Sequence, residues 1–188
     1  MRKLFLFMMV SLDGYFEGLG HAIDWHSADT EFNQFAAEQI EQVDTLIFGR
    51  RTYELLSRYW PNAKAQDEYD AIVTEKMNQL RKVVFSRSIN GSSWHNTTVS
   101  ADIAEVEKLK REPGKEIAVF GSNALAVALL NARLLDEWRV MVNPVVLGTG
   151  TSLFSGRKEP LKLSLSEIRS FKSGNVLFSY RPNSHQVA

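Results

Sequence analysis

The chain has 188 residues, of which 44% are hydrophobic and 23% are charged, a composition typical of one globular domain with its own core. Its 22 lysines and arginines balance 22 aspartates and glutamates, so it lacks the basic excess expected of a nucleic-acid-binding protein. Cysteine is absent, which excludes disulfides, cysteine-ligated zinc, iron–sulfur clusters and a thiol nucleophile. We expect a single domain over residues 1–182 and a flexible tail over residues 183–188.

The first residues, MRKLFLFMMVSLDG, combine two cations with an apolar run, a pattern shared by signal peptides and buried strands. The run is short and no small-residue cleavage site follows it, so we expect a buried strand over 4–12, covered on both faces. No apolar run in the sequence approaches the roughly 18 residues needed to span a membrane. We therefore expect a cytoplasmic protein.

The remaining hydrophobic patterns predict alternating helices and strands. After a loop to residue 26, the expected elements are a helix over about 29–42, a strand over 43–48, helices over 50–59 and 65–80, a strand over 83–85, a helix over 102–111, a strand over 117–120, a helix over 123–133, a strand over 137–147, and a hairpin of strands 161–171 and 176–181. Leu55, Leu56 and Tyr59 are expected to form the buried face of their helix, and Asp102 an N-cap. The alternation predicts an α/β fold with a largely parallel sheet and antiparallel strands at one edge.

Two strand ends share one pattern, in which an apolar strand ends at a glycine and a helix begins at once. They are LIFG–RRTYE, with Gly49 before Arg50 and Arg51, and IAVFG–SNALA, with Gly121. In a parallel sheet both lie at the carboxyl ends of strands, where open α/β folds bind ligands. Arginines at a helix N-terminus oppose the helix dipole unless an anion lies among them. The pattern therefore favours a phosphate site.

A third strand ends in KVVFSRS, where Ser86 and Arg87 follow the apolar residues. Sites for NAD usually offer an acidic residue to the adenosine ribose. Hydroxyls and a cation suit a 2′-phosphate instead, so a bound dinucleotide should be NADP rather than NAD.

GRRTYE, VVFS and IAVFGS, taken in this order, resemble the dihydrofolate reductase-like superfamily. SLDGYFEG and LLDEWRVMVNPVVLGTGTSLF are similar to the reductase domain of the bifunctional riboflavin-biosynthesis enzyme and to its small stand-alone relatives. The resemblance extends from Lys3 to about Tyr180. It implies a three-layer α/β/α fold with a mixed, mostly parallel sheet and a C-terminal antiparallel hairpin. It also implies an NADPH-dependent reductase of a small heterocyclic or carbonyl substrate.

Carried over to this chain, the resemblance assigns residues to each part of NADPH. Those expected to hold its phosphates are Gly49, Arg50, Arg51 and Thr52. Those expected at the adenosine 2′-phosphate are Ser86 and Arg87. Those expected along the pyrophosphate and nicotinamide are Gly121, Ser122, Asn123 and Ala124, with Met9 and Phe16 near the nicotinamide ring.

The chain departs from the folate reductases at two places. They carry a Gly-Gly pair where this sequence has Gly121-Ser122, and they place a buried carboxylate on the first helix. Asp24, Asp29 and Glu31 are the candidates for that carboxylate here. Folate reduction remains an alternative function, and a non-catalytic NADP(H)-binding regulatory module is another. Without cysteine the chain lacks the zinc-deaminase signature of the bifunctional enzyme, so we expect a stand-alone reductase.

The loop GHAIDWHSAD gathers histidines and aspartates, but their spacing matches no known ligand pattern and we expect no metal. We expect the loop to cover the active site, with Asp24 as the proton donor. Asp13, Trp25 and Asn143 are expected to contact the substrate, although Asp13 also fits a turn-forming role. A homodimer is expected by analogy with riboflavin-type relatives.

Overall fold

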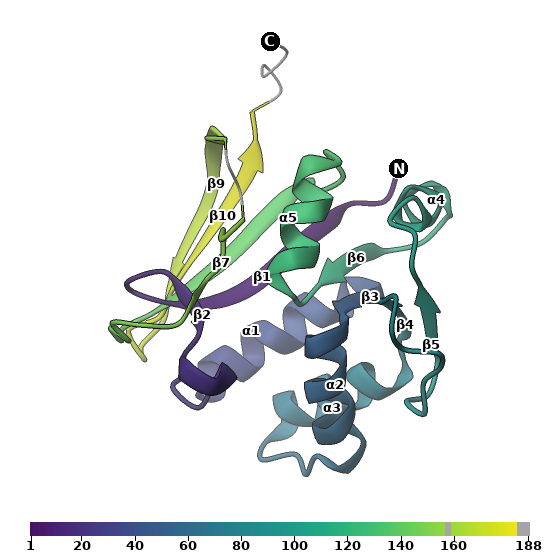
Figure 1. Cartoon of the computed structure of the whole chain (residues 1–188). Coiled ribbons are helices and arrows are strands. Elements are labelled where there is room, and N and C mark those ends of the chain that lie inside the picture. Colours follow the sequence, from purple (N-terminus) through teal and green to yellow (C-terminus); the bar gives the residue numbers. More distant parts are fainter. Residues whose placement is uncertain (157–158, 184–188) are drawn as a thin grey trace.

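The computed structural model describes residues 1–156 and 159–183. Its elements in chain order (Figure 1) are β1 (Leu4–Ser11), β2 (Tyr15–Glu17), η1 (Leu19–His21), α1 (Thr30–Glu41), β3 (Val43–Gly49), α2 (Arg50–Tyr59), η2 (Trp60–Asn62), α3 (Glu68–Gln79), β4 (Arg81–Phe85), β5 (Thr97–Ser100), α4 (Glu105–Arg111), β6 (Glu116–Val119), α5 (Asn123–Asn131), β7 (Glu137–Asn143), β8 (Thr151–Ser152), β9 (Leu163–Ser170) and β10 (Val176–Pro182).

The centre of the molecule is an eight-stranded sheet in the order β5-β4-β3-β6-β1-β7-β10-β9. The strands from β5 to β7 are parallel to one another, and β10 runs antiparallel to both β7 and β9. The predicted α/β fold, with a mostly parallel sheet and a C-terminal antiparallel hairpin, is therefore confirmed.

Helices cover both faces of the parallel part of the sheet. Leu4 and Leu6 of β1 pack with α4 and α5 in one apolar cluster, whereas Phe5 packs with α1, α2 and α3 in another. This alternation explains the unbroken apolar sequence of β1, because a strand buried on both faces needs apolar side chains at every position. Within the described residues, no helix combines the length and the apolar character needed to cross a membrane.

Three short strands were not expected from the sequence. Strand β5 has the polar sequence TTVS, which shows no apolar alternation. Strands β2 and β8 pair with each other inside segments expected to be loops. The predicted N-cap at Asp102 is also wrong: α4 begins at Glu105, and the Asp102 carboxylate accepts the Ala104 N–H within the preceding turn.

The predicted buried face of α2 is wrong for two of its three residues. Leu55 and Tyr59 are 47% and 53% exposed, while the buried side chain of α2 is Tyr53. Its ring packs 6.3 Å from that of Trp94, which anchors the helix to the sheet. Leu55 and Leu56 instead line a cavity. An apolar stripe on a helix can face a cavity as well as a core. Leu55 lines the cavity, Leu56 also packs against the core, and the Tyr59 ring packs edge-on against Trp60.

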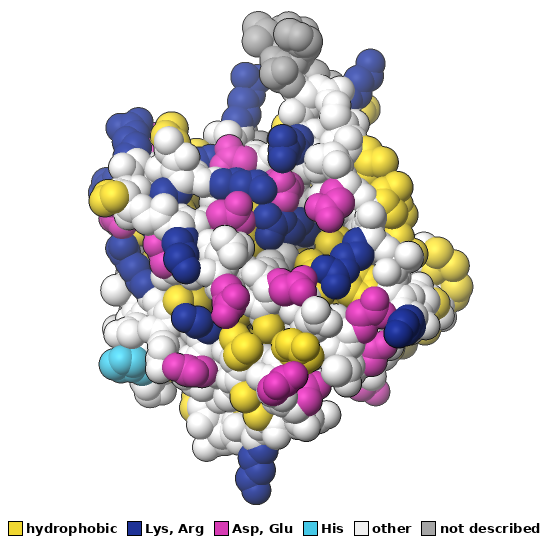
Figure 2. Space-filling view, turned by 180° about the vertical axis from the view of Figure 1, so that it is seen from behind, with side chains coloured by type: hydrophobic (Ala, Val, Ile, Leu, Met, Phe, Trp, Pro, Cys, Tyr) yellow, Lys and Arg dark blue, Asp and Glu magenta, His cyan; other side chains and the backbone are white. Residues whose placement is uncertain are grey.

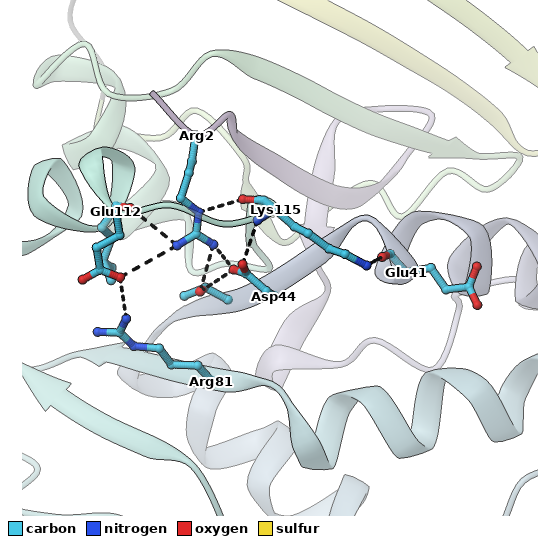
Figure 3. Close-up of polar contacts among 8 residues, drawn as sticks. Arg2, Glu41, Asp44, Arg81, Glu112 and Lys115 are labelled. Atoms are coloured by element: carbon cyan, nitrogen blue, oxygen red, sulfur yellow. Dashed lines mark hydrogen bonds and ion pairs between the residues drawn. The ribbon is translucent and has the colours of Figure 1, made fainter.

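The amino ends of the strands are held by a charged network around Arg2 (Figure 3). The buried Arg2 guanidinium pairs with Asp44 at the start of β3 and donates to the backbone oxygen of Lys115 (2.7 Å). Glu112, at the end of α4, lies 4.0 Å from Arg2 and 2.7 Å from Arg81 of β4. Arg2 is the buried member, so removing Asp44 would leave its charge without its closest carboxylate, and the network fixes this end of the sheet.

Candidate functional site

Two glycine junctions meet at the carboxyl ends of adjacent strands: Gly49 between β3 and α2, and Gly121 between β6 and α5. The Gly49 N–H donates to the Gly121 oxygen (2.8 Å). A Cβ at Gly49 would lie 2.4 Å from the Ser122 Oγ and 3.0 Å from its backbone nitrogen. Gly121 has φ +103° and its peptide bond to Ser122 is cis. The close approach therefore requires glycine at both positions.

The helices that begin at these junctions have open N-termini. Neither α2 nor α5 has a side-chain N-cap or an acidic residue in its first turn. In contrast, α1 and α3 are capped by Asp29 and Asp67, and the first turns of α1, α3 and α4 all contain acidic residues. Of the α-helices in the described part of the chain, the two at the glycine junctions alone present unpaired N–H groups and an uncompensated positive dipole end.

The two arginines of the first junction differ in their surroundings. Arg50 pairs with Glu54 one turn along α2 (3.0 Å), and both side chains are about 40% exposed. No described residue forms an ion pair or hydrogen bond with the guanidinium of Arg51, and Arg51 is exposed. Both arginines line the same cavity. Arg51 is therefore the cation of this junction that is free to bind an anion.

The third strand end lies next to the first two, because β4 neighbours β3. The Ser86 Oγ accepts the N–H groups of Ser88 (3.1 Å) and Ile89 (3.2 Å), so it stabilises its own loop. The Arg87 side chain is exposed. All three strand ends thus meet at one edge of the sheet, as the sequence pattern indicated, with Ser86 and Arg87 outside the cavity.

A cavity of about 620 Å³ opens beside the strand ends, between β1, α1, α2 and α3. Its size is that of cavities that hold cofactors and small substrates. The predicted cofactor residues that line it are Met9, Phe16, Arg50, Arg51, Thr52, Ser122 and Asn123. Gly49, Gly121 and Ala124 do not line it. Most of its wall is apolar, with aromatic rings from Phe7, Phe32 and Phe120.

Helix α1 brings no carboxylate to the cavity. The residues of α1 in its wall are Phe32, Asn33, Ala36, Gln39 and Ile40. Asp29 accepts the Phe32 N–H as the helix N-cap (2.9 Å), and Glu31 accepts the Lys172 N–H (2.8 Å). The carboxylate that folate reductases carry on their first helix therefore has no counterpart in this wall.

Asp24 and Trp25 lie outside the cavity wall. The Asp24 side chain is exposed, and the Trp25 Nε1 donates to the Ala22 oxygen (3.1 Å). The Trp25 ring packs edge-on against His26, at 4.4 Å between centroids. The loop thus contributes His21, Ile23 and His26 to the cavity rather than the two residues expected from the sequence.

Asp13 and Asn143 brace the loops around the site. The Asp13 carboxylate accepts the Ser11 hydroxyl (2.6 Å) and the Gly148 N–H (2.7 Å), bonds that hold the pKa of Asp13 below its usual value. The buried Asn143 side chain accepts the Ser27 N–H (3.0 Å) and donates to the Val10 oxygen (3.4 Å). Neither residue lines the cavity.

Sequence reasoning missed Glu17 of β2, a carboxylate that lines the cavity together with Glu54 of α2 and Asp70 of α3. Its Oε1 accepts the Thr151 hydroxyl (2.8 Å) and lies 2.8 Å from the His21 Nδ1. The side chain is 12% exposed, and Oε2 has no partner among the described residues. Thr151 is 134 residues away in sequence, so no local pattern indicates the contact. The one local feature that reflects this contact is Gly150, where a Cβ would lie 2.2 Å from the backbone oxygen of Glu17.

His26 is a second polar group of the cavity wall. Its Nε2 is buried and has no hydrogen-bond partner among the described residues. Burial lowers the pKa of His26 to about 4, so the imidazole is neutral near pH 7. No group of three histidine, aspartate or glutamate side chains in residues 1–156 and 159–183 is arranged to hold a metal ion.

The strand order and the two glycine junctions define a dihydrofolate reductase-like α/β fold, which two solved structures share. One is a putative riboflavin biosynthesis protein from Shewanella sp. PV-4 (TM-score 0.72, 18% identity, 96% of this chain and 99% of that chain). The other is a diaminohydroxyphosphoribosylaminopyrimidine deaminase/5-amino-6-(5-phosphoribosylamino)uracil reductase from Thermotoga maritima (TM-score 0.69, 15% identity), of which this chain covers 57%.

The RibD C-terminal domain family matches residues 2–177, and the chain belongs to this family. The resemblance seen in the sequence is thereby confirmed. The uncharacterized protein YyaP of Bacillus subtilis (strain 168) is 34% identical over 185 residues, which are 97% of this chain and 96% of YyaP. YwjB of the same strain is 29% identical over 172 residues. The family is one of reductase domains, so the class of enzyme it indicates is an oxidoreductase.

Proposed function

We propose that the protein is an NADPH-dependent reductase of a small heterocyclic or carbonyl substrate. The observation that carries this proposal is that α2 and α5 begin, uncapped, at adjacent strand ends beside a cavity of about 620 Å³. Open helix N-termini and a free arginine fit the phosphates of a dinucleotide. Membership of a family of reductase domains supports the same reading.

Each part of the site has a role in holding the cofactor. The N–H groups that open α2 and α5 hold the pyrophosphate, together with Arg51 and Thr52. Ser86 and Arg87, at the end of β4, are proposed to bind the 2′-phosphate. Met9 and Phe16 provide an apolar wall for the nicotinamide. When bound there, NADPH supplies a hydride, and the apolar wall excludes water from the reaction.

Glu17 is the proposed proton donor, in place of the exposed Asp24. Hydride addition to a C=N or C=O carbon forms a C–H bond and leaves a negative nitrogen or oxygen that takes up one proton. The Glu17 Oε2 is the carboxyl oxygen free to deliver it, while Thr151 and His21 fix Oε1. The His21 side chain is 57% exposed, so it connects the carboxylate to solvent for reprotonation.

The cavity wall narrows the substrate class. Aromatic and aliphatic side chains suit a flat ring, and the Thermotoga relative is named as a reductase of an aminouracil. Folate reduction is less well supported, because α1 brings the amides of Asn33 and Gln39 but no carboxylate to the cavity wall. A substrate of the ring or carbonyl type, reduced without an ion pair to α1, is the better fit.

Titration with NADPH, followed by the fluorescence of the cofactor, tests the proposal. We expect saturable binding at micromolar concentrations, with NADH bound more weakly. Arg87→Ala should reduce this preference, and Arg111→Ala, an exposed arginine of α4, is the matched control that leaves it unchanged. Absence of NADPH binding would refute the proposal.

Oxidation of bound NADPH is then followed with aminopyrimidine, pterin and carbonyl acceptors. Glu17→Gln should bind NADPH normally and lose most of the turnover, with Glu17→Asp retaining part of it. If Asp24→Asn abolishes turnover while Glu17→Gln does not, the assignment of the proton donor is wrong. Binding without oxidation of any acceptor would favour a regulatory module instead.

A further inference from the structure

The loop between β4 and β5 contains the pair Asn90-Gly91, which the proposed function does not use. Asn90 alone among the asparagines of the sequence is followed by glycine. In such a pair the backbone nitrogen of the glycine can attack the carboxamide carbon of the asparagine, because glycine has no side chain to crowd that nitrogen. Both residues are exposed. The pair therefore combines a reactive sequence with access to water.

Fixed residues flank this pair on both sides. Before it, the Ser86 Oγ accepts the Ile89 N–H (3.2 Å), and the Ile89 side chain packs against the core cluster that contains Trp94. After it, the Ser92 hydroxyl shares a hydrogen bond with the Tyr53 hydroxyl of α2 and accepts the Trp94 N–H (3.1 Å). Within the described residues, neither the carboxamide of the asparagine nor the N–H of the glycine makes a hydrogen bond. The pair is therefore the part of the loop that is free to rearrange.

We propose that Asn90 is a site of spontaneous deamidation, which replaces its neutral carboxamide by a carboxylate. The Gly91 nitrogen forms a bond to the carboxamide carbon and loses its proton, and ammonia leaves, so that a succinimide ring closes. Water then opens the ring. Attack at the side-chain carbonyl gives aspartate, and attack at the backbone carbonyl gives isoaspartate, in which the main chain runs through the side-chain carbon. Either product carries one new negative charge, and the only co-reactant is water.

The new charge lies in the loop that carries the proposed 2′-phosphate site. Arg87 is three positions before Asn90, is exposed and has no carboxylate partner among the described residues. A carboxylate at position 90 would repel a phosphate and offer Arg87 a competing partner. The formal net charge of the chain is zero, and on the face shown in Figure 2 charges of both signs are interspersed, so one added charge does not merge into a surface field of its own sign. Deamidation should therefore weaken NADPH binding more than NADH binding, a consequence that, unlike the modification itself, rests on the proposed function.

Incubation of the full chain in mildly alkaline buffer, followed by mass spectrometry of its tryptic peptides, tests the modification. Trypsin releases residues 88–108, which contain both Asn90 and Asn96. The mass should rise by about 1 Da at Asn90. It should not rise at Asn96, whose carboxamide donates to the Gln79 oxygen (2.7 Å). Gly91→Ala should slow the reaction by at least about tenfold, because its Cβ crowds the attacking nitrogen. Nothing lies within 4 Å of that Cβ, so the variant should keep its fold. A wild type that keeps its mass at Asn90, while the chain unfolded in urea gains it there, overturns the proposal.

Asn90→Asp measures the consequence for the cofactor in titrations with NADPH and NADH. The Kd for NADPH should rise by about 3- to 10-fold, as expected for like charges that repel through water, and the Kd for NADH should not change. Asn90→Gln is the matched control, because it keeps a neutral amide at this position, and it should bind both cofactors like the wild type. Equal NADPH affinities of Asn90→Asp and Asn90→Gln would overturn the predicted consequence. If the wild type binds no NADPH, the proposed function fails, and the mass measured at Asn90 still decides the modification.

Discussion

Gly49→Ala tests the close contact between the two glycine junctions. Gly49 has φ −76°, which suits alanine, so the cost of the substitution is steric rather than conformational. The new Cβ would lie 2.4 Å from the Ser122 Oγ and 3.0 Å from its backbone nitrogen, whereas ordinary contacts begin at 3.4 Å. The hydroxyl can rotate away, but the nitrogen immediately precedes α5 and cannot retreat without moving the start of that helix.

The expected loss of stability is about 1–3 kcal/mol, the range observed for overpacked sites. For a domain of this size, such a loss lowers Tm by roughly 2–12 °C. The same displacement separates the N-termini of α2 and α5, so NADPH affinity should fall by about tenfold, equivalent to about 1.4 kcal/mol. Stability and cofactor binding should therefore decline together.

Thermal unfolding by circular dichroism and an NADPH titration measure the two effects. Gly91→Ala is the matched control, because nothing lies within 4 Å of a Cβ built at Gly91. Adding Ser122→Gly to Gly49→Ala removes two of the three short contacts and should restore part of the lost stability. A Gly49→Ala protein within about 0.5 kcal/mol of the wild type, with unchanged NADPH affinity, would show that the junctions are not tightly coupled.

Four further substitutions test the charges of the molecule. Arg51→Ala should raise the Kd for NADPH by about 10- to 100-fold in a fluorescence titration. Arg50→Ala should raise it much less, because Glu54 already pairs with Arg50. Equal increases in Kd would contradict the assignment of Arg51 as the arginine that binds the phosphate. Lys82→Met leaves two carbonyls at the end of α3 without a donor, which should cost about 1–3 kcal/mol in urea unfolding. Burial lowers the pKa of Lys82 from 10.5 to about 8. Between pH 8 and 10.5 the Lys82 side chain is therefore protonated in the unfolded chain but neutral in the folded protein. The free energy of unfolding of the wild type should accordingly rise relative to that of Lys82→Met as pH increases over this range. Burial lowers the pKa of His26 from 6.5 to about 4, so the unfolded chain takes up a proton before the folded protein does as pH falls through this range. The free energy of unfolding of the wild type should therefore fall by up to about 3 kcal/mol more than that of His26→Gln. If the two proteins lose stability in parallel with falling pH, His26 is solvated.

The sequence predicted most of the fold because its strongest patterns coincide with buried surfaces. Strand β1 is apolar at nearly every position, and α1 repeats apolar residues at helical spacing, so both were expected within two residues of their bounds. Strand β5 was missed because TTVS owes its place to pairing with β4 rather than to burial of its own side chains. Leu55 was assigned to the core because apolar spacing does not distinguish a core from a cavity wall. Tyr59 was assigned to it because the spacing does not show that its ring packs on Trp60 at the surface.

Some residues of the candidate site could likewise be predicted from the sequence, and others could not. The glycine junctions could be predicted because parallel strands end at one edge of a sheet, whatever the path of the loops. Glu17 could not be predicted, since its place depends on a contact with Thr151, 134 residues further along the chain. Asp13 and Asn143 are polar residues at strand ends, as ligand-binding residues often are, yet their hydrogen bonds are used by neighbouring loops.

The open N-termini of α2 and α5 carry a cost that can be measured. An N-cap contributes about 0.5–2 kcal/mol, and Ser122, at the N-cap position of α5, makes no side-chain cap. Ser122→Asp should supply one and, with a negative charge at the positive dipole end, raise the free energy of unfolding by about 0.5–1 kcal/mol. The same carboxylate would repel a phosphate, so NADPH binding should weaken by at least about 100-fold. Ser122→Asn caps without the charge and separates the two effects. If Ser122→Asp raises stability and leaves NADPH binding intact, the N-terminus of α5 does not hold the cofactor.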